Sequence, residues 1–135
     1  MLVVLPTKEQ LEDHLLDKMT NQDIASIYGL SFQKVIQLIK KYQLIPAKLR
    51  KDDHYIVYEH WLNGKVVYVG SGIWYRCRRY TNRRNPLHRE VMASGKIQYQ
   101  IVAEFEEVSL ARAHESILIK KYKAMGQAIF NKQVH

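Results

Sequence analysis

The sequence predicts an α+β protein, in which a small three-stranded antiparallel sheet flanked by helices follows an all-helical segment. Three observations lead to this prediction. Apolar residues recur at helical spacing through the first third of the chain. Two runs rich in Val, Ile and Tyr then flank Asn63-Gly64, which is the strongest short-range signal for a β-hairpin. A third strand-like run, residues 97–105, lies between two helical stretches, an order typical of α+β units.

Each of the three N-terminal helices is predicted to begin after a Ser or Thr, whose side chain can accept a hydrogen bond from an unpaired backbone N–H. Two of these residues are followed three positions later by Gln or Asp, as in a capping box. Gly29 can end the middle helix because glycine tolerates a left-handed conformation. The predicted helices are residues 8–18 after Thr7 (with Gln10), 21–28 after Thr20 (with Asp23) and 32–42 after Ser31.

The second and third helices resemble the helix-turn-helix family over about 22 residues. Ala25 occupies the small position at which the helices cross, and Gly29 follows in the turn four residues later. Helical hairpins of this size also serve as packing or dimerisation modules, and 7 basic against 5 acidic residues in positions 1–50 leave that alternative open. The resemblance implies that the third helix enters the major groove of double-stranded DNA, with Ser31, Gln33, Lys34 and Gln37 facing bases or phosphates.

Residues 47–53 are predicted to be a linker. The surrounding sequence loses its apolar periodicity and mixes Pro with alternating charges, as IPAKLRKDD. We therefore expect a helix-turn-helix segment over residues 1–46 and a second domain over residues 54–135.

The loop of the predicted hairpin decides which face of the sheet each tyrosine occupies. A two-residue turn at Asn63-Gly64 pairs Tyr58 with Val69 and places Tyr58 and Tyr68 on opposite faces. A three-residue loop, with Gly64 as a left-handed bulge, pairs Tyr58 directly with Tyr68 and places both on one face. Both registers are compatible with the sequence.

The remaining elements follow from the same signals, and Ser109 is expected to cap the last helix. Glu115 borders the apolar stripe of this helix, where a carboxylate is costly without a partner. It is therefore either a salt-bridged residue at the helix boundary or a functional group. The predicted elements are helices over residues 74–80, 86–93 and 109–124 and a strand over residues 97–105.

Composition and charge narrow the class of function. The chain has 135 residues, 47% of them hydrophobic and 25% charged, which excludes a disordered or low-complexity protein. Its formal net charge of +8 makes a polyanion the first partner to consider. Cys77 is the only cysteine, so neither an internal disulfide nor a thiolate zinc site can form. No run is apolar enough for a membrane span or typical of a secretory signal, so we expect a cytoplasmic protein.

Basic residues concentrate between Arg76 and Arg89, where six arginines occur without an acidic residue. The planar guanidinium fork matches phosphate oxygens, so this stretch predicts contact with a nucleic-acid backbone. A solvated basic helix face is the alternative. The arginines predicted to bind DNA are Arg78, Arg79, Arg83 and Arg84.

Residues 54–132 resemble the GIY-YIG nuclease family in the order and spacing of their motifs. The two signature triplets stand as Ile56-Val57-Tyr58 and Tyr68-Val69-Gly70, with the tyrosines ten residues apart. Members with a G-x-G turn before the catalytic arginine are most similar to the stretch VYVGSGIWYR, and FNK supplies a late asparagine, Asn131. Ile56 departs from the family's first glycine, and Tyr80 stands where some members have a histidine.

The resemblance implies a GIY-YIG-like sheet and a metal-dependent DNA endonuclease, a hydrolase of phosphodiester bonds. Glu115 would hold one Mg²⁺ or Mn²⁺ per active site. Tyr58 would accept or relay the proton of the attacking water, and Tyr68 would position that water. Arg76 would stabilise charge on the phosphate, and Asn131 would fix Glu115 or the backbone of the site.

Several alternatives remain open at this stage. Arg78 has the spacing of the catalytic arginine in repair-type members, although Gly70-Ser71-Gly72 favours Arg76. The rival function is a non-catalytic helix-turn-helix DNA-binding regulator. The same site chemistry would serve restriction, homing or phage-type DNA cleavage in a bacterial or phage-infected cell. Cleavage of both strands would favour a homodimer on DNA.

Overall fold

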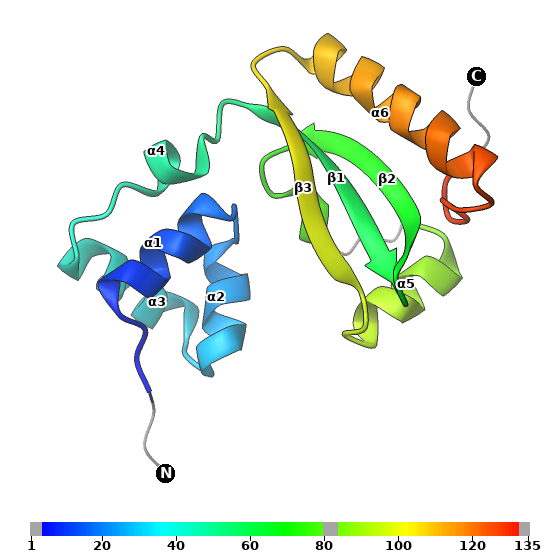
Figure 1. Cartoon of the computed structure of the whole chain (residues 1–135). Coiled ribbons are helices and arrows are strands. Elements are labelled where there is room, and N and C mark those ends of the chain that lie inside the picture. The colour runs from blue at the N-terminus through cyan, green and yellow to red at the C-terminus, as the bar shows by residue number, and fades with distance from the viewer. Residues whose placement is uncertain (1–3, 80–83, 133–135) are drawn as a thin grey trace. The chain divides into compact units, whose positions relative to one another are not determined.

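The computed structural model describes residues 4–79 and 84–132 (Figure 1). Its contacts divide the chain into two units, Met1–Asp52 and Asp53–His135. Arg83 and Tyr80, which the sequence analysis considered, lie outside the described residues. None of the described helices has the length and apolar character needed to cross a membrane.

Unit 1 is helical, and local capping explains where its helices begin. Thr7 and Thr20 each form the predicted capping box, and Ser31 accepts a hydrogen bond from the Lys34 N–H. Gly29 ends the second helix in the left-handed region, with φ of 65°. The predicted helices are thus confirmed, with ends that shift by one or two residues. The elements are α1 (Lys8–Leu16), α2 (Asn21–Tyr28), α3 (Phe32–Lys41) and α4 (Pro46–Arg50).

The prediction of a linker over residues 47–53 is wrong for its first part, because α4 occupies it and packs as part of unit 1. Arg50 is only 6% exposed. Its Nε and Nη2 donate to the carbonyl of Met19 at 3.0 and 2.7 Å, and Nη2 also donates to Asn21 Oδ1 at 2.7 Å. One of the alternating charges is therefore a buried arginine, which attaches α4 to the rest of unit 1 by hydrogen bonds to a backbone carbonyl and a side-chain amide.

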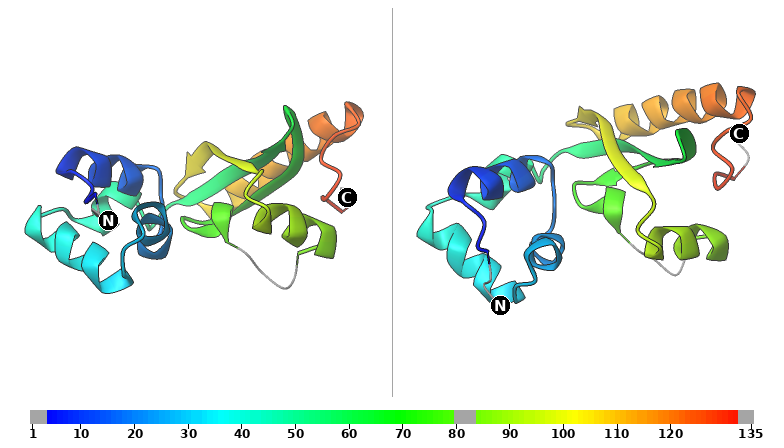
Figure 2. Two further views of the ribbon diagram at one scale, coloured as in Figure 1. Left: turned by 90° about the horizontal axis from the view of Figure 1, so that it is seen from below. Right: turned by 60° about the horizontal axis from the view of Figure 1, so that its bottom comes forward.

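Unit 2 contains a three-stranded antiparallel sheet, as predicted, and its strand order is β2-β1-β3. Helix α6 covers one face, and η1 and α5 lie on the other (Figure 2). The helix over residues 86–93 is confirmed, whereas the one over residues 74–80 shrinks to η1. The elements are β1 (Tyr55–Leu62), β2 (Lys65–Ile73), the 3-10 helix η1 (Arg76–Arg78), α5 (Pro86–Ala93), β3 (Gln98–Phe105) and α6 (Val108–Ala124).

The last helix begins before Ser109, so the prediction that this serine caps it is wrong. Glu107 occupies the N-cap position without a side-chain hydrogen bond. Local capping therefore does not determine where α6 starts.

The hairpin combines the two-residue turn with a bulge further along β2. Asn63 and Gly64 both have positive φ, 53° and 77°, and Leu62 pairs with Lys65. Trp61 pairs with Val66 but His60 pairs with Tyr68, so one extra residue of β2 lies between these pairs. This residue, Val67, is buried with Met92 and Ile97.

The bulge brings the two signature tyrosines to the same face of the sheet. Tyr58 pairs with Gly70, so both registers considered from the sequence are wrong in their pairing. Tyr58 and Tyr68 nevertheless lie diagonally across β1 and β2, with ring centroids 6.2 Å apart. An extra residue in one strand reverses the alternation of faces beyond it, which is why turn length alone did not predict the outcome.

Candidate active site

Gly70 is required where it stands because the ring of Tyr58 lies across it. A β-carbon added at Gly70 would overlap the Cζ and hydroxyl of Tyr58. Because Gly70 has no side chain, the ring of Tyr58 on the central strand β1 can pack against the edge strand β2. The tyrosine of the first signature triplet therefore lies on the glycine of the second.

Tyr58 lies deep in the domain. It is 1% exposed, and burial raises its pKa above the ordinary value for a tyrosine. Tyr68 is only partly buried. A hydroxyl that stays protonated can relay a proton but is poorly suited to act as a phenolate base, so burial favours the relay role for Tyr58.

A pair of buried histidines lies beside the tyrosines. The Nε2 of His60 lies 2.6 Å from the carbonyl oxygen of Cys77, and a carbonyl can only accept. His60 Nδ1 therefore accepts from His88 Nε2 at 2.9 Å, which assigns the tautomers of both rings. Burial lowers the pKa of His60 to about 3 and that of His88 to about 4. Both imidazoles are neutral at pH 7.

Arg84, predicted to contact DNA phosphates, lies in the interior, 9% exposed. Its Nη2 donates to the hydroxyl of Tyr58 at 3.3 Å, and its guanidinium carbon lies 4.9 Å from the ring centroid of Tyr68. The side chain thus faces the two tyrosines. Its neighbours Arg78 and Arg79 lie nearer the surface, over the rings of Tyr99 and Tyr75 at 5.7 and 5.3 Å.

Glu115 approaches β2 from the other face of the sheet, on α6. Ser71 Oγ donates to its Oε2 at 3.1 Å. Burial raises the pKa of Glu115, and the Ser71 hydrogen bond and the charges of Arg112 and Arg76 lower it in part. Glu115 therefore has the partner that a half-buried carboxylate needs, and two guanidinium groups lie within electrostatic reach.

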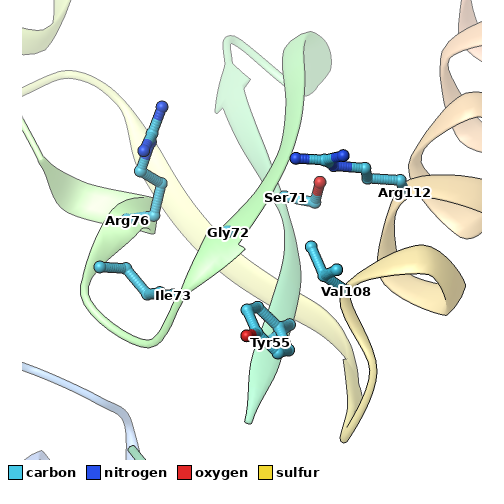
Figure 3. Close-up of a pocket in the computed structure, with 7 residues that line it drawn as sticks. All are labelled: Tyr55, Ser71, Gly72, Ile73, Arg76, Val108 and Arg112. Atoms are coloured by element: carbon cyan, nitrogen blue, oxygen red, sulfur yellow. The ribbon is translucent and has the colours of Figure 1, made fainter. Parts of the chain in front are cut away.

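A pocket of about 220 Å³ lies at the edge of the sheet, next to Ser71 (Figure 3). Arg112 points from α6 toward Ser71, and Arg76 lies on the other side of β2 (Figure 3). Gly72 leaves room for Arg76, because a β-carbon there would lie 3.0 Å from the arginine Cγ. The residues that line the pocket are Tyr55, Ser71, Gly72, Ile73, Arg76, Val108 and Arg112.

The predicted catalytic residues therefore form two groups on either side of β2. Tyr58 and Tyr68 lie on the face of η1 and α5, whereas Glu115 lies on the face of α6. Arg76 lines the pocket from the turn after β2 and lies over Gly72. The structure gathers these residues around one edge strand and separates the tyrosines from the carboxylate by the thickness of the sheet.

Asn131 contacts the backbone of the site instead of Glu115. Its Oδ1 accepts from the Val69 N–H and its Nδ2 donates to the Val69 carbonyl, both at 2.8 Å. The N–H groups of Ala128 and Phe130 donate to the carbonyls of Val66 and Val67. The C-terminal stretch thus extends along the outer edge of β2 just before the residues that line the pocket.

The predicted DNA-reading side chains of α3 lie partly at the surface of unit 1. Gln33 and Gln37 are exposed and Lys34 is partly exposed. Ser31 is also exposed, and its hydroxyl caps α3 by accepting from the Lys34 N–H at 3.1 Å. The glutamines are therefore the side chains of this set best placed to meet a ligand.

Sequence reasoning missed Arg112, Ser71 and the internal role of Arg84. Arg112 precedes Glu115 by three residues on a helix, a spacing that brings side chains together, so it could have been found. Ser71 could have been found from strand alternation once the register was known. Nothing in the sequence separates Arg84 from the other arginines around it.

A divalent cation at Glu115 would depend on few protein ligands. The described residues contain no group of three His, Cys, Asp or Glu side chains able to hold a metal ion. Magnesium sites in phosphate chemistry commonly use one or two carboxylates, water and substrate phosphates. Glu115 with the Ser71 hydroxyl fits such a site, and Arg76 and Arg112 oppose a cation unless an anion is present.

No protein-family model, curated protein or solved structure matches this chain. The class of site is therefore defined by its own chemistry: one half-buried carboxylate and two arginines at the edge of a sheet, with a tyrosine pair on the opposite face.

Proposed function

We propose that this protein is a metal-dependent endonuclease that hydrolyses phosphodiester bonds of double-stranded DNA. The observation that carries the proposal is the pocket at β2, which Arg76, Arg112 and Ser71 line, together with the hydrogen bond from Ser71 to the adjacent carboxylate of Glu115. Guanidinium groups bind phosphate oxygens in pairs, and a carboxylate can hold a hard cation beside the same phosphate. The pocket therefore fits a phosphodiester together with Mg²⁺ or Mn²⁺.

Each residue near the pocket has a chemical task in this proposal. Arg76 stabilises negative charge that develops on the phosphate, and Arg112 holds a second phosphate oxygen. Glu115 would hold the cation, and Ser71 orients the carboxylate. When bound, a divalent cation there supplies Lewis-acid stabilisation of a phosphoryl oxygen.

The tyrosine pair has a separate task. This task requires the phosphate to lie at the edge of β2, where Arg76 lies over Gly72 and also lines the pocket. Tyr68 is the more accessible of the two tyrosines, so we assign it to positioning the attacking water there. Tyr58, buried and protonated, relays the proton by giving up its own hydroxyl hydrogen as it takes another. Asn131 supports both tasks through the backbone of β2.

Unit 1 supplies DNA binding in this proposal. Ala25 of α2 is 1% exposed, and Gly29 is left-handed in the turn that leads to α3. A small buried residue and a glycine turn are typical of a helix-turn-helix. The polar side chains of α3 would contact bases and phosphates in the major groove, with Arg78 and Arg79 of unit 2 on the backbone. Double-strand cleavage would need two oppositely oriented sites and therefore a homodimer on DNA.

The test is cleavage of supercoiled plasmid with and without Mg²⁺ or Mn²⁺. We expect metal-dependent nicks or linear DNA from the wild type and from Glu90→Gln, an exposed acid on α5. Glu115→Gln should abolish cleavage and leave DNA affinity nearly unchanged, because the carboxylate contributes little to docking. Intact plasmid from several DNA sources with the wild type would overturn the endonuclease and favour the non-catalytic regulator. Sedimentation on DNA, compared with the products, tests the dimer.

A further inference from the structure

We propose that Arg84 is a positioning residue of this active site, which fixes the hydroxyl of Tyr58 and the turn that carries Arg76. The inference rests on the proposed endonuclease function. It assigns an internal role to an arginine that lies in a basic stretch otherwise suited to DNA binding.

The contacts of Arg84 join elements that carry separate parts of the site. Its Nη2 donates to the Tyr58 hydroxyl on β1 at 3.3 Å and to the carbonyl of Arg76 at 3.4 Å. Its Nε donates to the carbonyl of Arg79 at 3.1 Å. One planar group therefore connects the buried tyrosine with the start and the end of η1, and an ammonium group on a flexible stem could not reproduce this fork.

The described surroundings of Arg84 supply hydrogen-bond acceptors and aromatic rings. No carboxylate among the described residues forms an ion pair with Arg84, which lies near Tyr58, Tyr68 and the neutral His60 and His88. Burying a guanidinium costs hydration unless its donors are satisfied. Carbonyls, a phenol oxygen and the face of Tyr68 satisfy them here, so the cation is held in a fixed orientation.

This orientation has a consequence for Tyr58. Because the guanidinium donates to the phenol oxygen, the hydroxyl hydrogen of Tyr58 must point toward a different acceptor. The positive charge also counteracts part of the rise in the Tyr58 pKa that burial causes. Arg84 thus sets both the direction of the hydroxyl and the ease with which its proton moves.

The first test is a double-mutant cycle measured by single-turnover cleavage. Arg84→Met should slow the chemical step by roughly 10²-fold while DNA affinity stays within about two-fold, the pattern for loss of a preorganised interaction. Arg84→Lys should not restore the rate. On a Tyr58→Phe background the same Arg84→Met change should cost less than on the wild-type background, because the contact with the hydroxyl is already absent and only the contacts with the carbonyls of Arg76 and Arg79 remain. Lys120→Met, exposed on α6, is the neutral control.

Equal losses on both backgrounds would overturn the proposal, since they would show a general structural role. An unchanged rate in a folded Arg84→Met protein would also overturn it. Arg79→Met provides the contrast, because loss of an exposed DNA-binding arginine should weaken DNA binding.

The second test does not depend on cleavage and so separates this inference from the proposed function. In protein labelled with ¹³C at tyrosine Cζ, the Tyr58 signal should move in Arg84→Gln, which is smaller and uncharged, and that of Tyr122 should not. An unmoved Tyr58 signal would overturn the contact even if the wild type cleaves DNA. A wild type that cleaves nothing would overturn the endonuclease while this signal still reports on Arg84.

Discussion

At the scale of single residues, the proposed site depends on how its carboxylate is paired. Glu115 has a raised pKa because it is partly buried, and the Ser71 hydroxyl lowers that pKa by donating a hydrogen bond. A proton and a divalent cation compete for the same carboxylate. The pH below which cleavage is lost should therefore depend on the pKa of Glu115.

Ser71→Ala should move the acid limb of the pH–rate profile to higher pH. Loss of the serine hydroxyl removes a hydrogen bond that favours the ionised form of Glu115. The pKa of Glu115 therefore rises further, and a higher pH is needed to ionise the carboxylate. Cleavage rates across pH at subsaturating Mg²⁺ are the measurement, with exposed Ser109→Ala as the control. A limb that stays in place would argue against Glu115 as the cation ligand.

A second residue-scale prediction concerns the packing of Tyr58 on Gly70. Gly70→Ala should lower the free energy of unfolding by about 2 kcal/mol, because the new methyl group overlaps the ring. Gly72→Ala should cost less, since its neighbour is the flexible Arg76 side chain. Denaturant unfolding of both variants measures the difference. If Tyr58→Ala fails to relieve the cost at Gly70, the steric explanation is incorrect.

At the scale of elements, the outer edge of β2 is held by the stretch that follows α6. Asn131 reproduces the two hydrogen bonds that a neighbouring strand would make with Val69. An edge strand without such a partner leaves its backbone groups open to solvent. The stretch thereby steadies the strand that carries Gly70, Ser71 and Gly72.

Asn131→Ala should increase hydrogen exchange of the Val69 amide by roughly ten-fold, which corresponds to the loss of about one net hydrogen bond. Cleavage should also slow, because Ser71 lies two residues along the same strand. Exchange measured by NMR tests this, and exposed Lys132→Ala should leave the amide unaffected. Unaltered exchange in Asn131→Ala would mean that the side-chain pairing does not protect this edge.

At the scale of the whole molecule, the two units have separate hydrophobic cores and the chemistry lies in only one of them. The core of unit 1 is built from α1, α2 and α3, and that of unit 2 from the sheet and its helices. Every proposed catalytic residue lies in unit 2. Units with their own cores commonly fold alone.

Residues 53–135 alone should therefore fold and retain metal-dependent cleavage with weaker DNA affinity. The boundary matters, because a fragment from residue 47 would retain the exposed remains of α4, including Arg50. Circular dichroism and plasmid cleavage by the fragment are the measurements. An unfolded fragment would show that unit 1 is needed for packing, as the alternative interpretation of the helical hairpin holds.

The sequence by itself determined the features that depend on interactions within a few residues. The capping boxes at Thr7 and Thr20, the left-handed Gly29 and the hairpin at Asn63-Gly64 were predicted correctly, because each involves neighbours in the chain. Only the tertiary structure decided features that depend on distant contacts. Packing of Val67 with Met92 and Ile97 accompanies the bulge that shifts Tyr58 onto Gly70. The same physical reason separates Arg84 from its neighbours, since its carbonyl, phenol and aromatic partners come together only when the sheet and η1 are assembled.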